Sequence, residues 1–183
     1  MNYSERRTGP DRVGYKMGTI IISKENIMNE TKFTVEPNTQ SLSIERTFNA
    51  PVDKVFDAFV NPEKVVRWWG GKTFETKADT FEPRSGGSWR IVQSDENGEY
   101  NFHGVFHEVA LNERIIWTFE FEGLPEKGHA LMETMHFTEQ DGKTTIKSVS
   151  VFQSVADRDG MVASGMEDGS RAGYDALAEL VEG

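Results

Sequence analysis

Residues 99–122 read EYNFHGVFHEVALNERIIWTFEFE. In the second half of this stretch, large apolar residues occupy every other position, namely Ile115, Trp117, Phe119 and Phe121. This period of two predicts a strand over Arg114–Glu122 with one apolar face. A second strand is predicted over Glu99–Val109, and the connection between the two is only four residues long. Strands joined by so short a turn pair in the antiparallel direction.

More strands are predicted on both sides of this hairpin, at Ser41–Phe48, Phe74–Glu82, Ser88–Ser94, Ala130–Thr138 and Thr144–Phe152. Two short helices, over residues 51–60 and 62–68, follow the first strand, and each begins at a proline, which suits a first helical turn. A long helix is predicted from about Asp157 to Val181. This order of elements indicates the α+β class with an antiparallel sheet rather than a parallel βαβ fold.

Residues 1–40 differ from the rest of the chain. They show no sustained hydrophobic period and are interrupted by glycine and proline, as at Gly9-Pro10. We predict a loosely ordered N-terminal arm at 1–40 and one domain at 41–183. An edge strand through Thr19–Ile22 remains an alternative, as does a natural start at one of the internal methionines, Met17 or Met28.

The composition excludes several classes of function. The chain has 183 residues, of which 30 are acidic and 20 basic, for a net charge of −10. This charge disfavours binding to nucleic acids and to anionic membranes. The absence of cysteine excludes disulfides, thiolate nucleophiles and cysteine-ligated metals. With no long apolar segment or signal peptide in the sequence, we expect a soluble, cytoplasmic protein that needs no cofactor.

The predicted C-terminal helix has an unusual apolar stripe. Gly165, Gly169 and Gly173 are spaced by four residues, and Met161 and Met166 lie on the same side. Each glycine inside a helix costs about 1 kcal/mol relative to alanine, so the stripe needs an explanation. One explanation is close packing of the helix on a curved sheet, and the other is that the helix roofs a space. The sequence leaves both open.

Polar residues that could carry chemistry are few. Glu133 alternates with Leu131, Met135 and Phe137, so it would be desolvated if that face points inward, whereas an edge position would leave it in solvent. His103 and His107 are four residues apart, which on a strand separates them by about 13 Å, too far to share a metal ion. We therefore predict no metal site and no catalytic constellation from spacing alone.

Five motifs carry a family resemblance, namely residues 46–56, 66–70, 81–90, the strand pair at 102–109 and 113–115, and the helix segments at 165–169 and 177–180. In this order they resemble the AHSA-type group (activator of the heat-shock chaperone ATPase, C-terminal-like) of the START-like or SRPBCC superfamily. The resemblance implies a helix-grip (START/Bet v-like) fold, in which a curved antiparallel sheet surrounds a long C-terminal helix and encloses a cavity. Ser170 departs from the tryptophan usual in this group, and Tyr174 from a smaller aliphatic residue.

The favoured function is non-enzymatic binding of a small hydrophobic or aromatic molecule between the sheet and the C-terminal helix. The residues predicted to line this cavity are Trp69, Trp89, Phe102, Trp117, Phe119, Phe121, Glu133, Met135, Met161, Gly165 and Met166. One alternative is a chaperone-associated, stress-response interaction module. The other is a cyclase- or hydrolase-type enzyme with Glu133 or His103 as general base. The sequence leaves the ligand and the oligomeric state open, a homodimer included.

Overall fold

The computed structural model describes residues 30–183, which contain eight strands in one sheet. The strands are β1 (Lys32–Val35), β2 (Ser41–Phe48), β3 (Glu75–Phe81), β4 (Ser88–Asp95), β5 (Gly98–Ala110), β6 (Arg114–Phe121), β7 (Leu131–Gln140) and β8 (Lys143–Val151). Their order across the sheet is β1-β2-β8-β7-β6-β5-β4-β3, and every neighbouring pair is antiparallel. The predicted α+β class and antiparallel sheet are confirmed.

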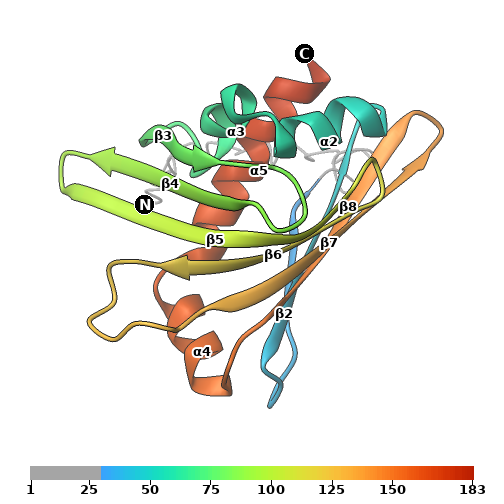
Figure 1. Ribbon diagram of the computed structural model, residues 1–183. Coiled ribbons are helices and arrows are strands. Elements are labelled where there is room, and N and C mark those ends of the chain that lie inside the picture. The colour runs from blue at the N-terminus through green and yellow to red at the C-terminus, as the bar shows by residue number, and fades with distance from the viewer. Residues whose placement is uncertain (1–29) are drawn as a thin grey trace, which may run out of the picture.

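Four helices lie in the described part of the chain: α2 (Val52–Val60), α3 (Pro62–Trp68), α4 (Val155–Ala163) and α5 (Met166–Glu182). Figure 1 shows α5 crossing one face of the curved sheet, with α2 and α3 near one end of α5 and α4 near the other. The start of α3 follows the sequence signals, since Pro62 takes the first turn and the Asn61 side chain accepts a hydrogen bond from the Glu63 amide. This is the helix-grip arrangement that the resemblance implied.

The sheet bends where its strands are irregular. Register shifts occur between Ala78 and Thr80 of β3 and between Phe106 and Glu108 of β5. Bulges of this kind increase local twist and bend a strand. On β5, a side chain at Gly104 would overlap the carbonyl group of Thr118, so only glycine allows this approach. The curvature produces a concave face, against which α5 packs.

The long C-terminal helix predicted over residues 157–181 is in fact two helices. Ser164 ends α4, and Gly165, with φ of +92°, separates it from α5. Left-handed backbone of this kind strains every residue with a Cβ, and glycine adopts it freely. The first glycine of the stripe therefore breaks the helix instead of lying inside it.

The sheet begins at Lys32, within the segment predicted as an arm. β1 pairs with β2, from Lys32 opposite Glu45 to Val35 opposite Leu42. The turn after β1 is fixed by Arg158 of α4, whose Nη1 donates to the carbonyl oxygens of Glu36 at 2.7 Å and Thr39 at 2.6 Å. The boundary at residue 41 is thus too late for the sheet. The possible strand at Thr19–Ile22 and the internal methionines lie outside the described residues.

On the helix side, the hydrophobic core fills the space between α2, α3, the C-terminal half of α5 and the sheet. Phe56 and Phe59 of α2 meet Phe137 of β7 edge-on, with ring centroids 5.0 and 5.3 Å apart, and Leu177 of α5 is fully buried. The buried residues of α5 all lie between Gly173 and Val181, so the N-terminal half of this helix is outside the packed core.

Across residues 30–183, no helix combines the length and apolarity that a membrane crossing requires.

Candidate functional site

A cavity of about 450 Å³ lies between the concave face of the sheet and the N-terminal half of α5. Its walls come from β2 and β4–β8, from the α3–β3 segment, and from the α4–α5 junction. Ser164, Gly165 and Gly169 of this lining are exposed, which places an opening at the helix junction. The cavity is lined mainly by aromatic, aliphatic and thioether side chains.

Nine of the eleven residues predicted from the sequence line this cavity, namely Trp69, Phe102, Trp117, Phe119, Glu133, Met135, Met161, Gly165 and Met166. They come from six separate parts of the chain, and the curved sheet brings them together. Trp69 is central, because its ring stacks on Phe119 at 6.2 Å with an interplanar angle of 20° and contacts Trp117 at 5.8 Å.

The other two predicted residues, Trp89 and Phe121, do not line the cavity. Trp89 is 1% exposed and lies behind the lining rings, with centroids 5.5 Å from Trp69 and 5.2 Å from Trp117. Phe121 lies at the end of β6, where its ring packs beside Phe102 at 5.3 Å and over Gly123. Alternation predicted the correct face for both residues but not the extent of the cavity along that face.

Glu133 lies inside the cavity wall and is the main polar feature there. The Nε1 group of Trp117, directly opposite it on β6, donates a hydrogen bond of 2.8 Å to Glu133 Oε2. Burial raises the pKa of Glu133, and the hydrogen bond from Trp117 opposes part of that rise. The inward orientation is therefore correct, and the solvent-facing alternative is wrong.

Three hydroxyl groups surround Glu133. Ser148 and Ser150 of β8 are fully buried, and neither Oγ has a hydrogen-bond partner in the described structure. Tyr174 of α5 is also buried, and this burial, together with the nearby Glu133 carboxylate, raises the pKa of its phenol. Ser148 lies close enough to lower both pKa values slightly without forming a well-aligned hydrogen bond. The cavity thus has one polar end.

The position of Trp69 depends on two neighbouring residues. Gln93, buried on β4, donates from Nε2 to the Trp69 carbonyl oxygen at 3.1 Å. Gly70 has φ of +72°, and a Cβ there would overlap the Gln93 amide. Gly70 therefore allows both the turn and the hydrogen bond that hold the Trp69 backbone at the cavity wall.

The glycines of α5 play different roles. A Cβ at Gly169 would meet nothing within 4 Å, so this glycine faces open space next to the cavity. At Gly173 a Cβ would lie 3.4 Å from the Trp68 carbonyl oxygen, which is ordinary contact with the α3–β3 segment. The open-space explanation therefore fits Gly169, whereas Gly173 does not show close packing on the sheet, because its neighbours lie in the α3–β3 segment and leave room for a Cβ.

Residues 49–182 match the family model described as activator of Hsp90 ATPase homolog 1-like protein. The match covers more than half of the chain. The chain belongs to this family. No match was found among curated proteins.

Solved structures share the fold of this AHSA1-like chain at low sequence identity. Protein Ms6760 from Mycobacterium smegmatis is 19% identical, with a TM-score of 0.76 over 82% of this chain and 96% of that one. A protein from Arthrobacter aurescens is 21% identical, with a TM-score of 0.76 over 82% and 91%. DynU16, from the dynemicin biosynthetic locus, is 20% identical, with a TM-score of 0.61 over 78% of this chain and 47% of its own. At these identities the likeness is one of fold.

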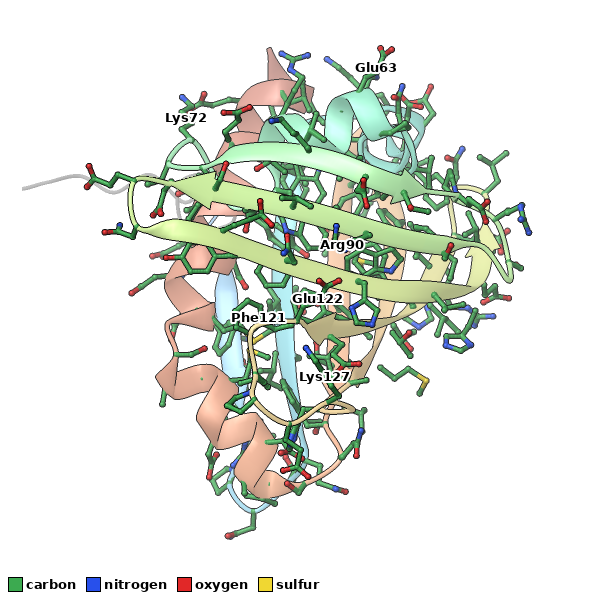
Figure 2. All side chains as sticks on the ribbon, turned by 60° about the vertical axis from the view of Figure 1, so that its left-hand side comes forward. Glu63, Lys72, Arg90, Phe121, Glu122 and Lys127 are labelled. Atoms are coloured by element: carbon green, nitrogen blue, oxygen red, sulfur yellow. The ribbon has the colours of Figure 1, made fainter. Side chains whose placement is uncertain are left out.

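His103, proposed from the sequence as an alternative general base, lies away from the cavity of the AHSA1-like chain. Its ring is 3.6 Å from Glu120 and 3.3 Å from Glu122 on the outer face of the sheet. Figure 2 shows Arg90 and Glu122 on that same face, where Arg90 binds both oxygens of Glu122 at 2.8 and 2.9 Å. No cluster of three or more potential metal ligands occurs within residues 30–183.

Several lining residues were not predicted, namely Ile44, Phe59, Trp68, Gly70, Phe74, Gln93, Tyr100, Leu131, Ser150, Ser164, Gly169, Ser170, Gly173 and Tyr174. Some carried a usable signal, since Tyr100 precedes Phe102 by two residues on the same strand and Leu131 alternates with Glu133. Phe74 lies in the loop between α3 and β3, where no hydrophobic periodicity indicates which side chains point inward. It reaches the cavity wall only because of the path that this loop takes.

Proposed function

We propose that this AHSA1-like protein binds a small apolar or aromatic molecule in the cavity between the sheet and α5. The observation that carries the proposal is the lining itself: rings of Trp69, Phe102, Trp117 and Phe119 face the thioethers of Met161 and Met166 across the space. Ligand sites typically have volumes of roughly 300–1,000 Å³ and apolar walls with a few polar groups. The volume of about 450 Å³ falls in this range.

The energetics favour an apolar guest. Each Å² of apolar ligand surface removed from water contributes about 25 cal/mol, less the cost of immobilising the ligand. The wall is held by aromatic contacts among the lining residues themselves, such as Phe102 on Phe119 at 5.3 Å. The methionines of the helix side can adjust to different shapes, because thioether side chains are flexible and polarizable. The proposed site is therefore rigid on the sheet side and adaptable on the helix side.

Tryptophan fluorescence tests the proposal directly. Trp69 and Trp117 line the cavity and Trp89 contacts both rings, so a bound aromatic molecule should shift or quench the emission in a saturable way. We expect this response from some members of a library of neutral mono- and bicyclic aromatic compounds. A lack of saturable response across the library, confirmed by calorimetry, would refute the proposal.

A variant with a filled cavity separates binding inside the site from binding elsewhere. Ser170→Trp places a large side chain in the lining of α5, so it should abolish the calorimetric signal of any ligand found. Asp168→Trp adds the same side chain at an exposed position outside the lining and should leave binding unchanged. Equal binding by wild type and Ser170→Trp would place the ligand outside the cavity.

Association with a chaperone is a second candidate, suggested by the family description and by one surface feature. Met132 and Val151 are exposed and lie opposite one another on β7 and β8, on the outer face of the sheet. Adjacent exposed apolar side chains are the kind of surface from which protein-interaction patches are built. A pull-down with a purified Hsp90-type chaperone tests it, with Met132→Lys as the control. Absence of association with the wild-type protein would eliminate this candidate.

A further inference from the structure

The polar end of the cavity is built from two neighbouring strands. Glu133 of β7 lies directly opposite Ser150 of β8, and both contribute to the lining. Opposed residues in an antiparallel pair have their Cβ atoms about 4.5–5.5 Å apart, so the carboxylate and the hydroxyl lie side by side. One ligand atom placed between them can contact both groups.

Each of these two side chains has an unused hydrogen-bonding capacity. Trp117 occupies Oε2 of Glu133, and Ser148 lies beside the carboxyl group without a well-aligned hydrogen bond to it, so Oε1 keeps unused acceptor capacity. The Ser150 side chain is fully buried, and its Oγ has no partner. A buried polar group without a partner is rare in native proteins because it loses its hydrogen bonds to water without replacement. The pair therefore points to a missing polar partner inside the cavity.

The charge around the cavity limits what that partner can be. The described lining contains one carboxylate, Glu133, and no lysine, arginine or histidine. Arg46 lies near Tyr174 but does not line the cavity. Its Nη1 donates to Asp175 and to Thr31, and its buried Nε has no partner among the described residues. An anionic ligand group next to the ionised form of Glu133 would meet a like charge, and the described lining holds no cation that could neutralise it.

We infer that the ligand of this cavity is an aromatic molecule carrying a hydroxyl group, whose O–H donates to Glu133 Oε1 and whose oxygen accepts from the Ser150 hydroxyl. This inference rests on the proposed function and names the class of ligand. A hydroxyl matches the site because it donates and accepts at one atom. An ether and a carboxylate ion both lack the O–H donor, and an ammonium group cannot accept from Ser150.

Burial also favours a neutral partner over a cation. The raised pKa of Glu133 indicates that its surroundings stabilise the uncharged carboxyl relative to the ion. An ammonium ligand would need the ionised form and would itself be desolvated, whereas a hydroxyl group can bond to either form of the side chain.

A matched ligand pair tests the inference. The probes are 2-naphthol and 2-methoxynaphthalene, which share the ring system and differ in the O–H donor. By calorimetric titration, the wild-type protein should bind 2-naphthol about tenfold more tightly, the effect of one hydrogen bond to a carboxylate. Equal affinity for the two probes would overturn the inference while leaving the proposed function intact. Binding of neither probe would overturn it together with the naphthalene-sized site on which it rests.

Variants of Glu133 and Ser150 then separate the roles of these two residues in binding 2-naphthol and 2-methoxynaphthalene. In Glu133→Gln, Trp117 retains an acceptor and the amide nitrogen faces the ligand, so both probes can accept from it and the preference for 2-naphthol should fall to about one. Ser150→Ala removes a donor from which the oxygen of either probe can accept, so it should weaken both probes by a similar factor and leave their ratio close to that of the wild type. Glu113→Gln removes an exposed carboxylate in the β5–β6 turn and should leave the ratio unchanged. An unchanged ratio in folded Glu133→Gln protein, verified by circular dichroism, would also overturn the inference.

Discussion

Trp117 and Glu133 face each other across β6 and β7, and the indole Nε1 group donates its hydrogen bond to a carboxylate that has no basic residue beside it in the cavity lining. Within residues 30–183, the one well-aligned hydrogen bond to this carboxyl group comes from a neutral donor, in a mainly apolar cavity wall. The contact links the stability of the fold to the polarity of the cavity, because removing the donor would raise the pKa of Glu133 further.

The first prediction compares two tryptophans that differ in their hydrogen bonding. Trp117→Phe removes the donor to Glu133 and should cost about 2–4 kcal/mol of unfolding free energy, from lost volume plus an unpaired carboxyl group. Trp89→Phe is the matched control, since Trp89 is equally buried and its Nε1 has no partner. It should cost about half as much. Urea unfolding of both variants measures the difference.

The difference in stability between Trp117→Phe and Trp89→Phe should depend on pH in a defined direction. Glu133 has a raised pKa in the folded state, so the stability tied to its neutral form is present below its unfolded pKa and is lost as the pH rises through the folded pKa. Trp117→Phe should raise that pKa further. Its stability deficit relative to Trp89→Phe should therefore be small near pH 4 and grow toward about pH 8. A deficit that is constant with pH would contradict the role of Trp117 as the donor.

The sequence predicted this site in part, for a reason that these two residues make clear. The alternation of Leu131, Glu133 and Met135 correctly placed Glu133 on the inward face. That Trp117 would lie opposite Glu133 depends on the register of β6 and β7, which are separated by a loop of nine residues. Register between strands is set by packing of the whole sheet, so no local pattern identifies the partner of Glu133.

The second prediction concerns two glycines four residues apart. Gly169→Ala should stabilise the protein by up to about 1 kcal/mol, because Gly169 is inside α5, meets no atoms at its Cβ position, and alanine has the higher helix propensity. Gly165→Ala should destabilise it by about 1 kcal/mol or more, since φ of +92° strains alanine. Thermal unfolding by circular dichroism measures both. Shifts of the same sign would contradict the division into α4 and α5.

These glycines also show why the helix break escaped prediction. Gly165, Gly169 and Gly173 have equivalent spacing in the sequence, and a helical period treats them alike. The structure separates them by backbone conformation at Gly165, open space at Gly169 and contact with Trp68 at Gly173. Each of these depends on tertiary neighbours or on the local dihedral angle, which a hydrophobic pattern does not contain.

The third prediction concerns an ion pair that ties the β6–β7 loop to α4. His129 Nδ1 lies 2.9 Å from Asp157 Oδ1, and Asp157 also bonds to the Ser154 side chain. The bond to Asp157 raises the pKa of His129, and the bonds from Ser154 and His129 lower the pKa of Asp157. The pair is therefore strongest between about pH 4 and 6.5, the unperturbed pKa values of the two groups.

The sign of the pH effect follows from these shifts. The stability from His129 is fully present below its unfolded pKa and is lost as the pH rises through the higher folded pKa. The melting temperature of the wild type should exceed that of His129→Gln near pH 6, and the gap should narrow by about pH 9. His107→Gln, at an exposed position of β5, is the control. A gap that widens with pH would refute the proposed pairing.

The last prediction concerns Arg158, which attaches the first strand to the rest of the domain. Arg158 is 4% exposed, and its guanidinium group donates to the carbonyl oxygens of Glu36 and Thr39 and pairs with Asp159. Arg158→Gln is too short to reach both carbonyls and should cost about 2–3 kcal/mol. Because the lost bonds hold only the turn between β1 and β2, amide hydrogen exchange should accelerate most at Lys32–Val35, while β6 and β7 stay protected. Arg67→Gln, an exposed arginine of α3, should show neither effect. Uniform acceleration across the sheet would mean that Arg158 supports the entire core instead of this one attachment.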